Sequence, residues 1–488
     1  MRSRGRRSGR DEHVLRAAAG VTLLVACAAA CSGSGARAPT PPPPADTTTN
    51  AAPADPGVLA AEPQRTGDAA RGWDALVNNG YVGCGAPRAL YDRFSGAAPD
   101  SWRLPGRTGR SADLPYFANA YTAPSGVEVV TANCLGCHAS FLRGELVVGL
   151  GDAAADFTMD VTPMIAAGAF LPGDAAQKAE LDKLLGRVKA LAPYMRTRTV
   201  GANPADHIAA VLFAHRDPHT LSWSDAPLIE LPSHEPIPVD VPAWWLLKKK
   251  TAMFHTGAGR GDQARIMMTA SVLCVDDVAA ARAVDAYFPD IRAYILSLEP
   301  PPFPAAIDAP LATSGKAVFE RRCSRCHGTY GEGGHYQTRV IPQKKVGTDP
   351  LLAEHAGQFA APFRTWFNSS FYGEIARLEP NDGYVAPPLD GVWATAPYLH
   401  NGSIQTLAEL LDSTLRERVF VVHRRRDAYD LDAVGWKTLG VTTPVDPAID
   451  RSVVYDASIP GYSNAGHTFG DTLTAEDRRA LLEYLKSL

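Results

Sequence analysis

The stretch "VTANCLGCHASF", residues 130–141, and the stretch "ERRCSRCHG", residues 320–328, share one pattern. Each has two cysteines three positions apart followed at once by a histidine: Cys134, Cys137 and His138 in the first, Cys323, Cys326 and His327 in the second. In an exported chain, C-x-x-C-H is typical of c-type haem attachment, in which both thiols bind the porphyrin and the imidazole ligates iron. Neither copy has the further Cys or His of a zinc site, or the βαβ context of a redox CxxC. The sequence therefore predicts two covalently bound haem c groups, with both histidines as iron ligands.

The first 30 residues have the layout of an export signal. Six arginines precede a short apolar run, which small residues follow. The run contains Leu24-Val25-Ala26-Cys27, which resembles a bacterial lipobox, so Cys27 is the expected lipidation site. Cys31 is the second choice, and an ordinary cleaved signal is the alternative. We expect a periplasmic or cell-surface protein held by a lipid anchor, with secretion as the other outcome.

Residues 31–66 are rich in Pro, Ala and Thr and hold little that a core would bury, which predicts a disordered tether. The chain has a formal charge of −4, and removing residues 1–26 would take away six arginines and two acids. The mature protein would be more acidic still. That charge argues against nucleic-acid binding, and it leaves the lipid anchor as the expected membrane contact.

The remaining length suits two domains, and the proline-rich stretch "EPPPFPAAIDAP", residues 299–310, separates them. We expect an N-terminal haem c domain over 67–305 and a C-terminal cytochrome c domain over 306–488. The predicted fold class is mainly α, with two cytochrome c-like haem domains and long irregular loops.

Helix signals stand at the ends of both predicted domains. In the second, Ser314 is the expected cap of a helix that runs into the haem motif, and Thr474 with Asp477 begins a terminal helix. These first and last helices are expected to pack across each other. The first domain ends similarly, because "PDIRAYILSL", residues 289–298, places a proline in the first turn and apolar residues at helical spacing.

Two cysteines remain outside the signal and the haem motifs, Cys84 and Cys274. Outside the cytoplasm a lone pair of thiols tends to be oxidised. We predict a disulfide between them, the alternative being two unrelated buried thiols.

The second haem cannot take the common methionine as its sixth ligand from its own domain, because no methionine follows Met268. His467 is the expected ligand, since it lies in the loop directly before the terminal helix, and a bis-histidine haem has a lower potential. His400 is the alternative for that position. The imidazoles available in this domain are His335, His355, His400, His423 and His467.

The sixth ligand of the first haem stays open at this point. An open position would make an enzyme and a closed one an electron carrier. The candidates are Met159, Met164, Met195, Met253, Met267, Met268, His207, His215, His219, His234 and His255.

Three further segments carry a resemblance to a known family. They are "PAWWLLKKKTAMFHTGAGRGDQARIMMTASVLC" (242–274), "VGTDP" (346–350) and "PPLDGVWATAPYLHNGSIQTL" (387–407). In this order around the two haem motifs, they resemble the rubber oxygenase (RoxA-like) branch of di-haem cytochromes. That branch is related to bacterial di-haem cytochrome c peroxidases and to MauG.

The resemblance implies an oxygen- or peroxide-binding first haem, open on its distal side, and a bis-histidine second haem that includes His467. The aromatic residues around the oxygen-binding haem map onto Trp244, Trp245 and Phe254, which are the expected catalytic-site residues. The alternative for the two tryptophans is interface packing.

Together these observations predict an exported di-haem c-type oxidoreductase. It would bind oxygen or peroxide at the first haem and exchange electrons through the second with a redox partner protein or a small-molecule donor. The alternative is a non-catalytic electron-transfer lipoprotein.

Overall fold

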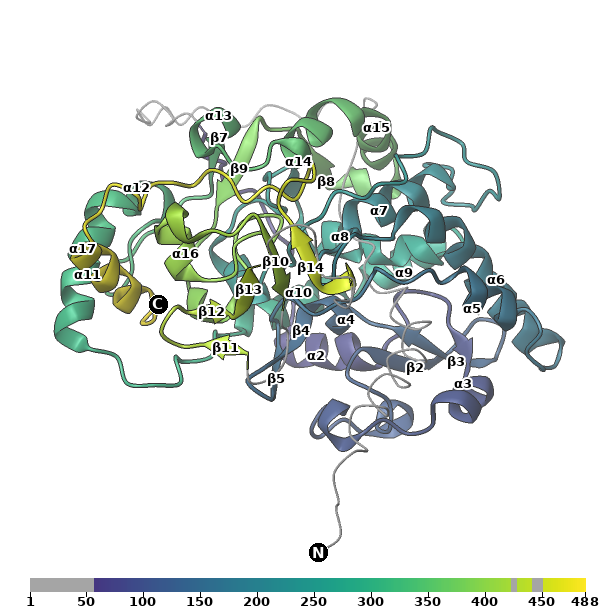
Figure 1. The fold of residues 1–488 in the computed structure, drawn as a ribbon. Coiled ribbons are helices and arrows are strands. Elements are labelled where there is room, and N and C mark those ends of the chain that lie inside the picture. The colour runs from purple at the N-terminus through teal and green to yellow at the C-terminus, as the bar shows by residue number, and fades with distance from the viewer. Residues whose placement is uncertain (1–56, 423–427, 441–450) are drawn as a thin grey trace, which may run out of the picture.

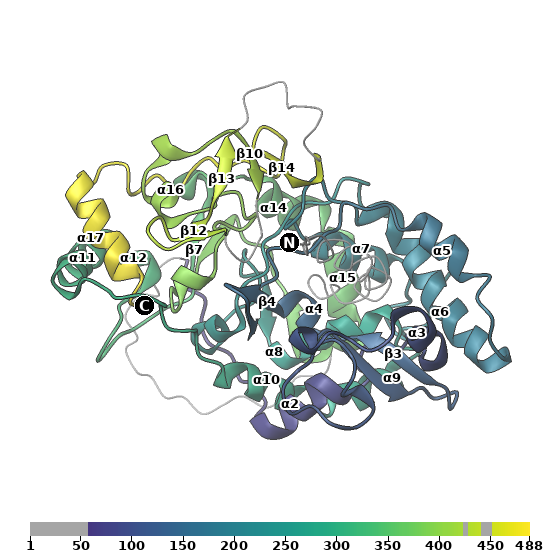
Figure 2. The same cartoon turned by 60° about the horizontal axis from the view of Figure 1, so that its bottom comes forward.

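The computed structural model describes residues 57–422, 428–440 and 451–488 (Figure 1). The predicted signal, the Cys27 lipobox, most of the tether and His423 lie outside the described residues. Two views place the helix pair α11 and α17 at one end of the molecule and helices α3, α5 and α6 at the other (Figures 1 and 2). The turn α4, which carries the first motif, lies in the central part with several short strands, whereas α12, which carries the second, lies beside α11 and α17 (Figures 1 and 2).

The prediction of a mainly α fold was wrong. The structure is 40% helix and 14% strand and has a mixed α/β fold with several small sheets. The strands are two to five residues long, so each shows too little alternation for the sequence pattern to separate it from a loop. Most of them are hairpins and bridges inside the segments that were expected to be irregular.

The first haem motif lies between two of these sheets. A three-stranded antiparallel sheet in the order β1-β3-β2 precedes it, and the β4–β5 hairpin comes directly after it. The strands are β1 (Ala86–Pro87), β2 (Ala118–Thr122), β3 (Glu128–Ala132), β4 (Ala139–Leu142) and β5 (Glu145–Val148).

The other sheets lie mainly in the second half of the chain, and the β6–β8 pair joins the two halves. Strands β7 and β9 pair, β10 lies between β13 and β14, and β11 pairs with β12. Their bounds are β6 (Gly259–Gly261), β7 (Arg339–Pro342), β8 (Ala376–Leu378), β9 (Gly383–Ala386), β10 (Val419–Val422), β11 (Tyr429–Asp430), β12 (Gly435–Trp436), β13 (Thr438–Gly440) and β14 (Val454–Asp456).

Two helix pairs cross at glycine, one in each half. Helix α2 (Ala69–Asn78) crosses α10 (Phe288–Ser297), and a Cβ on Gly72 would lie 1.9 Å from the Asp290 carbonyl oxygen. Helix α11 (Ala309–Arg322) crosses α17 (Ala475–Leu485) in the same way, with Gly315 against the Ala480 carbonyl oxygen at 1.9 Å. Only glycine lets these backbones approach so closely.

The predicted packing of the first and last helices of the second half is confirmed, and so is the Thr474 cap, whose side chain accepts from the backbone N–H of Asp477. The predicted start of α11 at Ser314 was wrong. The helix begins at Ala309, because Asp308 caps it and Pro310 occupies its first turn, which is a stronger start signal. Ser314 instead donates to the Pro310 carbonyl inside the helix.

The remaining helices connect these parts. The α-helices are α3 (Arg88–Ser95), α4 (Leu135–His138), α5 (Thr162–Gly168), α6 (Ala175–Leu191), α7 (Ala205–Ala214), α8 (Gln263–Met267), α9 (Val278–Asp285), α12 (Ser324–His327), α13 (Gln343–Val346), α14 (Leu351–Glu354), α15 (Ala361–Ser369) and α16 (Leu407–Leu411). The short η helices are η1 (Asp100–Trp102), η2 (Gly109–Ser111), η3 (Ala192–Tyr194), η4 (Trp244–Lys249), η5 (Met268–Leu273), η6 (His355–Phe359), η7 (Phe371–Glu374), η8 (Val392–Ala394), η9 (Ser413–Leu415) and η10 (Arg451–Val453).

The main hydrophobic core draws on both halves of the chain. Phe363, Trp366 and Phe367 of α15 pack into it together with helices α2, α7 and α10. A second core lies under α11 and α17 and contains Trp245, which is fully buried. The domain boundary near residue 305 stays a prediction.

The segment at the end of the predicted tether crosses both halves. The Leu59 N–H donates to the Thr338 carbonyl at 2.8 Å, and Arg65 forms ion pairs with Asp262 at 2.9 Å and Asp285 at 2.8 Å. The strand partners of this segment are therefore in the second half, and its ion-pair partners lie in both halves, since Glu62 pairs with Arg377 at 2.6 Å.

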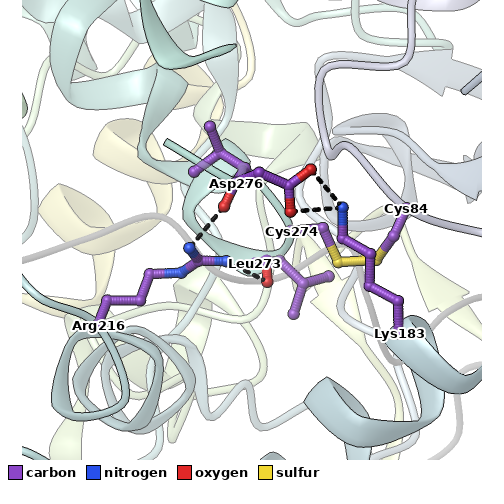
Figure 3. Close-up of a disulfide and its surroundings, with 7 residues drawn as sticks. Cys84, Lys183, Arg216, Leu273, Cys274 and Asp276 are labelled. Carbon is purple, nitrogen blue, oxygen red and sulfur yellow. Dashed lines mark hydrogen bonds and ion pairs between the residues drawn. A yellow bond between two sulfur atoms is a disulfide. The ribbon is translucent and has the colours of Figure 1, made fainter. Parts of the chain in front are cut away.

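The predicted disulfide between Cys84 and Cys274 is present, with Cα atoms 5.5 Å apart (Figure 3). Beside it, the guanidinium of the fully buried Arg216 donates to the carbonyls of Leu273 and Val275 at 3.0 and 2.5 Å. The disulfide and the arginine together hold in place the backbone at the end of η5. Among the described residues, no helix is both long and apolar enough to cross a bilayer.

Candidate haem sites

The first C-x-x-C-H motif is held in place by the end of the β-sheet. Strand β3 stops at Ala132, and the buried Asn133 side chain accepts from the Leu135 N–H at 2.9 Å. Cys134 and Cys137 then lie on the single turn of α4, and the Asn203 amide contacts the Cys137 sulfur at 3.7 Å. The residues between the first cysteine and the histidine, Leu135 to Cys137, are buried.

His138 ends this turn and stacks on Trp244, with ring centroids 4.7 Å apart and ring planes 19° apart. Burial lowers the pKa of His138 to about 4, and the Pro242 carbonyl partly opposes that shift. The imidazole is therefore neutral at physiological pH, which is the form that binds a metal.

His138 lines a cavity with about 1750 Å³ of empty space, part of it open to solvent. Cys134 and Cys137 line it too, so the three groups of the motif face one space. The second half of the chain also lines this cavity, through Leu352, His355 and Phe363.

The cavity narrows the choice of sixth ligand for the first site. Of the predicted candidates, Met253, His255 and Met267 line it. Others lie elsewhere: His215, for example, stacks on Trp223 with ring centroids 4.9 Å apart, and Met159 is exposed.

His355 was considered for the second haem, but it lines the first cavity. Its ring centroid is 5.9 Å from that of His207, which lies in α7. The sequence could not indicate this, because a contact between residues 148 positions apart leaves no local pattern.

Two charged residues of the cavity were also missed. Burial raises the pKa of Asp206 to about 7 and lowers the pKa of Lys250 to about 8. Both line the cavity. Lys250 ends a run of three lysines, of which Lys248 pairs with Glu299 and Lys249 with Asp390, both at 2.6 Å.

The second motif is more open. No residue of its turn, α12, is fully buried. The Nδ1–H of His327 donates to the Pro387 carbonyl at 2.9 Å, because a carbonyl can only accept. This bond fixes the tautomer and leaves Nε2 of His327 with a lone pair for a metal.

His467 faces His327 across a narrow space. Their ring centroids are 6.2 Å apart, and the ring planes form an angle of 63°. An imidazole nitrogen lies about 2 Å from a first-row metal ion, so two rings on opposite sides of one ion have centroids roughly 6 Å apart. Burial, with a smaller contribution from His327, lowers the pKa of His467 to about 3, so both rings are neutral.

The loop that carries His467 is anchored at several points. The His467 N–H donates to the Val346 carbonyl at 2.7 Å, and its backbone is left-handed, with φ at 46°. His467 Nδ1 has no hydrogen-bond partner among the described residues. The alternative, His400, instead stacks on Tyr384 with ring centroids 4.0 Å apart and lies 6.4 Å from His255.

The tryptophan pair connects the two sites. Trp244 stacks on His138, while the indole N–H of Trp245 donates to the Asp390 carbonyl at 2.9 Å. Asp390 lies three residues after Pro387, the partner of His327. Phe254 lines the first cavity with Trp244, but Trp245 packs into the second core.

Comparison with known proteins bears on the segment that supports His327. Residues 383–421 match the family of RoxA-like, cytochrome c-like proteins. This segment includes Pro387 and Asp390, the two residues whose carbonyls meet His327 and Trp245. The match supports the RoxA-like cytochrome family and a haem-based role in electron transfer or oxidation–reduction. A cytochrome c-like domain also implies covalently bound haem c.

Two curated relatives are uncharacterized proteins of Sinorhizobium fredii. The chain is 29% identical to y4iJ over 257 residues, which cover 39% of this chain and 41% of that protein. It is 29% identical to y4iM over 236 residues, which cover 40% of this chain and 52% of that protein. The matched regions thus span about half of each relative or less.

The residues at the second motif fit a haem, because Cys323 and Cys326 are free thiols and His327 offers an oriented lone pair. At the first motif Cys134 is a free thiol, whereas Cys137 is disulfide-bonded and would need reduction before it could bind a haem. Within the described ranges, no three or more His, Cys, Asp or Glu side chains gather around a possible metal position. An iron bound here would therefore need the four porphyrin nitrogens, with histidine on its axis.

Proposed function

We propose that this protein is an exported c-type cytochrome oxidoreductase with two haems of different roles. Cys134, Cys137 and His138 would hold the first haem, and Cys323, Cys326 and His327 the second, with His467 as its sixth ligand. The haem supplies the redox chemistry when bound, and the protein sets ligation, access and potential. The first site would receive oxygen or peroxide, and the second would exchange electrons.

One contrast carries the proposal. His138 lines a cavity with about 1750 Å³ of empty space, part of it open to solvent, whereas the ring centroid of His467 lies 6.2 Å from that of His327. The haem would fill part of the first cavity, and the solvent-open remainder could admit a small molecule, whereas a facing histidine would occupy the corresponding space at the second site. The protein thus has one site suited to a reactant and one suited to electron transfer.

The surroundings of the first site support small-molecule chemistry. Trp244, Phe254 and Met253 give the cavity apolar walls, which exclude bulk water. Asp206 is the carboxyl group in the same cavity whose pKa burial raises to about 7. A carboxyl of that pKa holds or releases a proton near neutral pH, as a general acid or base must.

The tryptophan pair supports electron exchange between the sites. Trp244 is in ring contact with His138, and Trp245 is hydrogen-bonded to the chain that orients His327. Two tryptophans that are consecutive in the chain thus contact the His138 ring on one side and the segment that supports His327 on the other. The electrons would come from a redox partner protein or a small-molecule donor.

Carbon monoxide titration of the reduced, haem-loaded protein tests the proposal. We expect one carbon monoxide per two haems, none after Cys134→Ala/Cys137→Ala, because that change removes the attachment of the first haem, and one extra after His467→Ala, because that change opens the second iron. His335→Ala is the matched control, since His335 is an exposed imidazole in the same half, and it should leave the stoichiometry at one.

A second candidate function is a non-catalytic electron carrier. Three residues favour it, because each lines the cavity and has a side chain that can ligate iron: His255, His355 and Met267. In that case the wild-type protein binds no carbon monoxide. Two molecules per two haems would instead contradict the role of His467.

The cellular location is a separate part of the proposal. The lipobox around Cys27 and the Pro-rich tether support a lipid anchor on the outer side of a membrane. Metabolic labelling with a radioactive fatty acid should label the wild-type chain and not Cys27→Ala, while Cys31→Ala stays labelled. Label in both variants would remove Cys27 as the site.

A further inference from the structure

The second haem motif lies in a strongly basic part of an acidic protein. Residues 316–345 contain seven Lys and Arg but only two Glu, whereas the whole chain has a formal charge of −4. The rest of the chain is therefore clearly negative. A local charge of opposite sign creates a field that a partner or ligand experiences at a distance.

Five of these cations are exposed and have no ion-pair partner among the described residues. Lys316, by contrast, is held by Glu320 at 3.9 Å. The five lie in the last turn of α11, in α12 and in α13, and they are Arg321, Arg322, Arg325, Lys344 and Lys345. We call them the basic rim.

The basic rim lies on both sides of the histidine pair. Arg325 is two residues from His327 in the same turn, and Lys345 precedes Val346, whose carbonyl accepts from the His467 N–H at 2.7 Å. Gly347 also lies against Gly466. His327 thus has a rim cation in its own turn, and His467 is hydrogen-bonded to the segment that carries two others.

An exposed aromatic residue lies beside His467. Phe469 is 43% exposed and meets the His467 ring edge-on, with ring centroids 5.2 Å apart. An apolar contact surrounded by charge is the usual composition of a transient docking surface. The first motif has no such arrangement, because Leu135 to Cys137 are buried.

We propose that the basic rim docks an acidic electron-transfer protein and that the second haem is where its electron enters. This rests on the proposed function, since it needs a haem between His327 and His467. One electron leaves the reduced partner and reduces ferric iron to ferrous, and no covalent bond forms or breaks. Phe469 would supply the apolar contact, and the rim would attract the partner's carboxylates.

Stopped-flow reduction of the oxidised, haem-loaded protein by reduced flavodoxin, an acidic one-flavin protein, tests this docking. We expect the rate to fall as salt rises, and the variant Arg321→Glu/Arg325→Glu to be about tenfold slower at low salt. The control is Arg93→Glu/Lys189→Glu, which makes the same charge change on α3 and α6 at the other end of the molecule (Figure 1). It should keep the wild-type rate.

Reduction by a cationic reagent is the complementary test, because the charge change should then have the opposite effect on the rate. Reduction by hexaammineruthenium(II) should be faster in Arg321→Glu/Arg325→Glu than in the wild type. Equal flavodoxin rates in all three proteins, or equal losses in the rim and control variants, would overturn the proposal. So would a changed midpoint potential of the second haem in the rim variant, because the arginines would then serve the haem propionates.

The haem content of each protein separates this result from the proposed function. If the wild type carries two haems and the second shows a bis-histidine spectrum, a negative docking result concerns the rim alone. If the second haem is missing, the proposed function itself fails, and the docking rates are not interpreted.

Discussion

The two C-x-x-C-H regions begin from the same five-residue pattern but have opposite surroundings. The first turn is buried between a β-sheet and a hairpin, and its histidine lines a large cavity against Trp244. The second has no fully buried residue, and its histidine faces His467. A motif can thus specify where a haem is attached while the packing around it determines what the iron can do.

The supporting helices are where the two regions are most alike. In each, a glycine lets two helices cross at backbone contact, Gly72 at Asp290 and Gly315 at Ala480. The regions differ in how the chain reaches the motif from these helices. In the second region α11 leads directly into the motif, while in the first a three-stranded sheet intervenes between α2 and the motif.

The largest effect is expected at the helix crossings. Gly315→Ala would place a Cβ 1.9 Å from the Ala480 carbonyl oxygen, so the helices must separate, at a cost of more than about 3 kcal/mol. Gly72→Ala should cost as much in the first region. Thermal unfolding followed at the haem band checks both.

Gly186→Ala is the control for these variants. It lies inside α6, and an added Cβ meets no atom within 4 Å. Alanine there should stabilise by about 1 kcal/mol, because it has the higher helix propensity. If Gly315→Ala behaves like Gly186→Ala, the two helices do not cross as closely as described.

A smaller loss of stability is expected when the disulfide is removed, and it should affect the first region more than the second. Replacing Cys84 and Cys274 by serine opens a link between residues 190 positions apart, and the expected loss is about 2–5 kcal/mol. The loss should fall on the first region, because both cysteines pack in its core. We expect the first haem's absorbance to change at a lower temperature, while the second haem's signal persists. Equal losses at both haems would mean that the regions unfold as one unit.

Replacing the sixth ligand of the second haem should shift the midpoint potential of that haem. His467→Met exchanges an imidazole for a thioether, which favours ferrous iron, so the midpoint potential should rise. A rise on the order of 100 mV corresponds to about 2.3 kcal/mol for one electron. Redox titration measures it for both haems, and the first haem should keep its potential. An unchanged second potential would exclude His467 as a ligand.

The smallest effect concerns the pH dependence of the first cavity. Asp206 has a folded pKa near 7 and an ordinary value of 3.8, so the folded state binds an extra proton between these values. Stability should therefore fall as pH rises from about 4 to about 7, and Asp206→Asn should remove that fall. The full shift would correspond to about 4 kcal/mol. Because Asp206 is only partly buried, solvent screening reduces the expected gain at pH 8 to on the order of 1 kcal/mol, with none at pH 4.

Thermal midpoints of the haem-loaded wild type and Asp206→Asn, taken from pH 4 to 8, measure this difference. Asp432→Asn, an exposed aspartate in the second half, is the control and should behave like the wild type. Parallel curves for all three proteins would mean that Asp206 is solvated in the folded state.

Several features were predicted correctly because they depend on neighbouring residues or, for the disulfide, on how many cysteines remain after the others are assigned. The Thr474 cap needs only a side chain and an N–H three residues later. The helix over 288–297 is explained by its apolar spacing, and the disulfide by the two cysteines that remained. The matched RoxA-like segment at 383–421 likewise overlaps the stretch that carried the family resemblance.

The errors have a common physical cause. The sheets were missed because strands of two to five residues gain their hydrogen bonds from distant partners, such as β6 with β8, rather than from their own pattern. The helix start at Ser314 was wrong because Asp308 and Pro310 form a stronger local signal just upstream.

By itself, the sequence determined the two C-x-x-C-H motifs, which thiols remain to form a disulfide, and how the last helix begins. The motifs and the cap each span a few residues, and the disulfide follows from the two cysteines that are left over. Only the tertiary structure decided that His355 reaches the first cavity, that Trp245 faces the second core, and that His467 lies 6.2 Å from His327. Such contacts join residues far apart in the chain, and the packing of the whole core fixes them rather than any local preference.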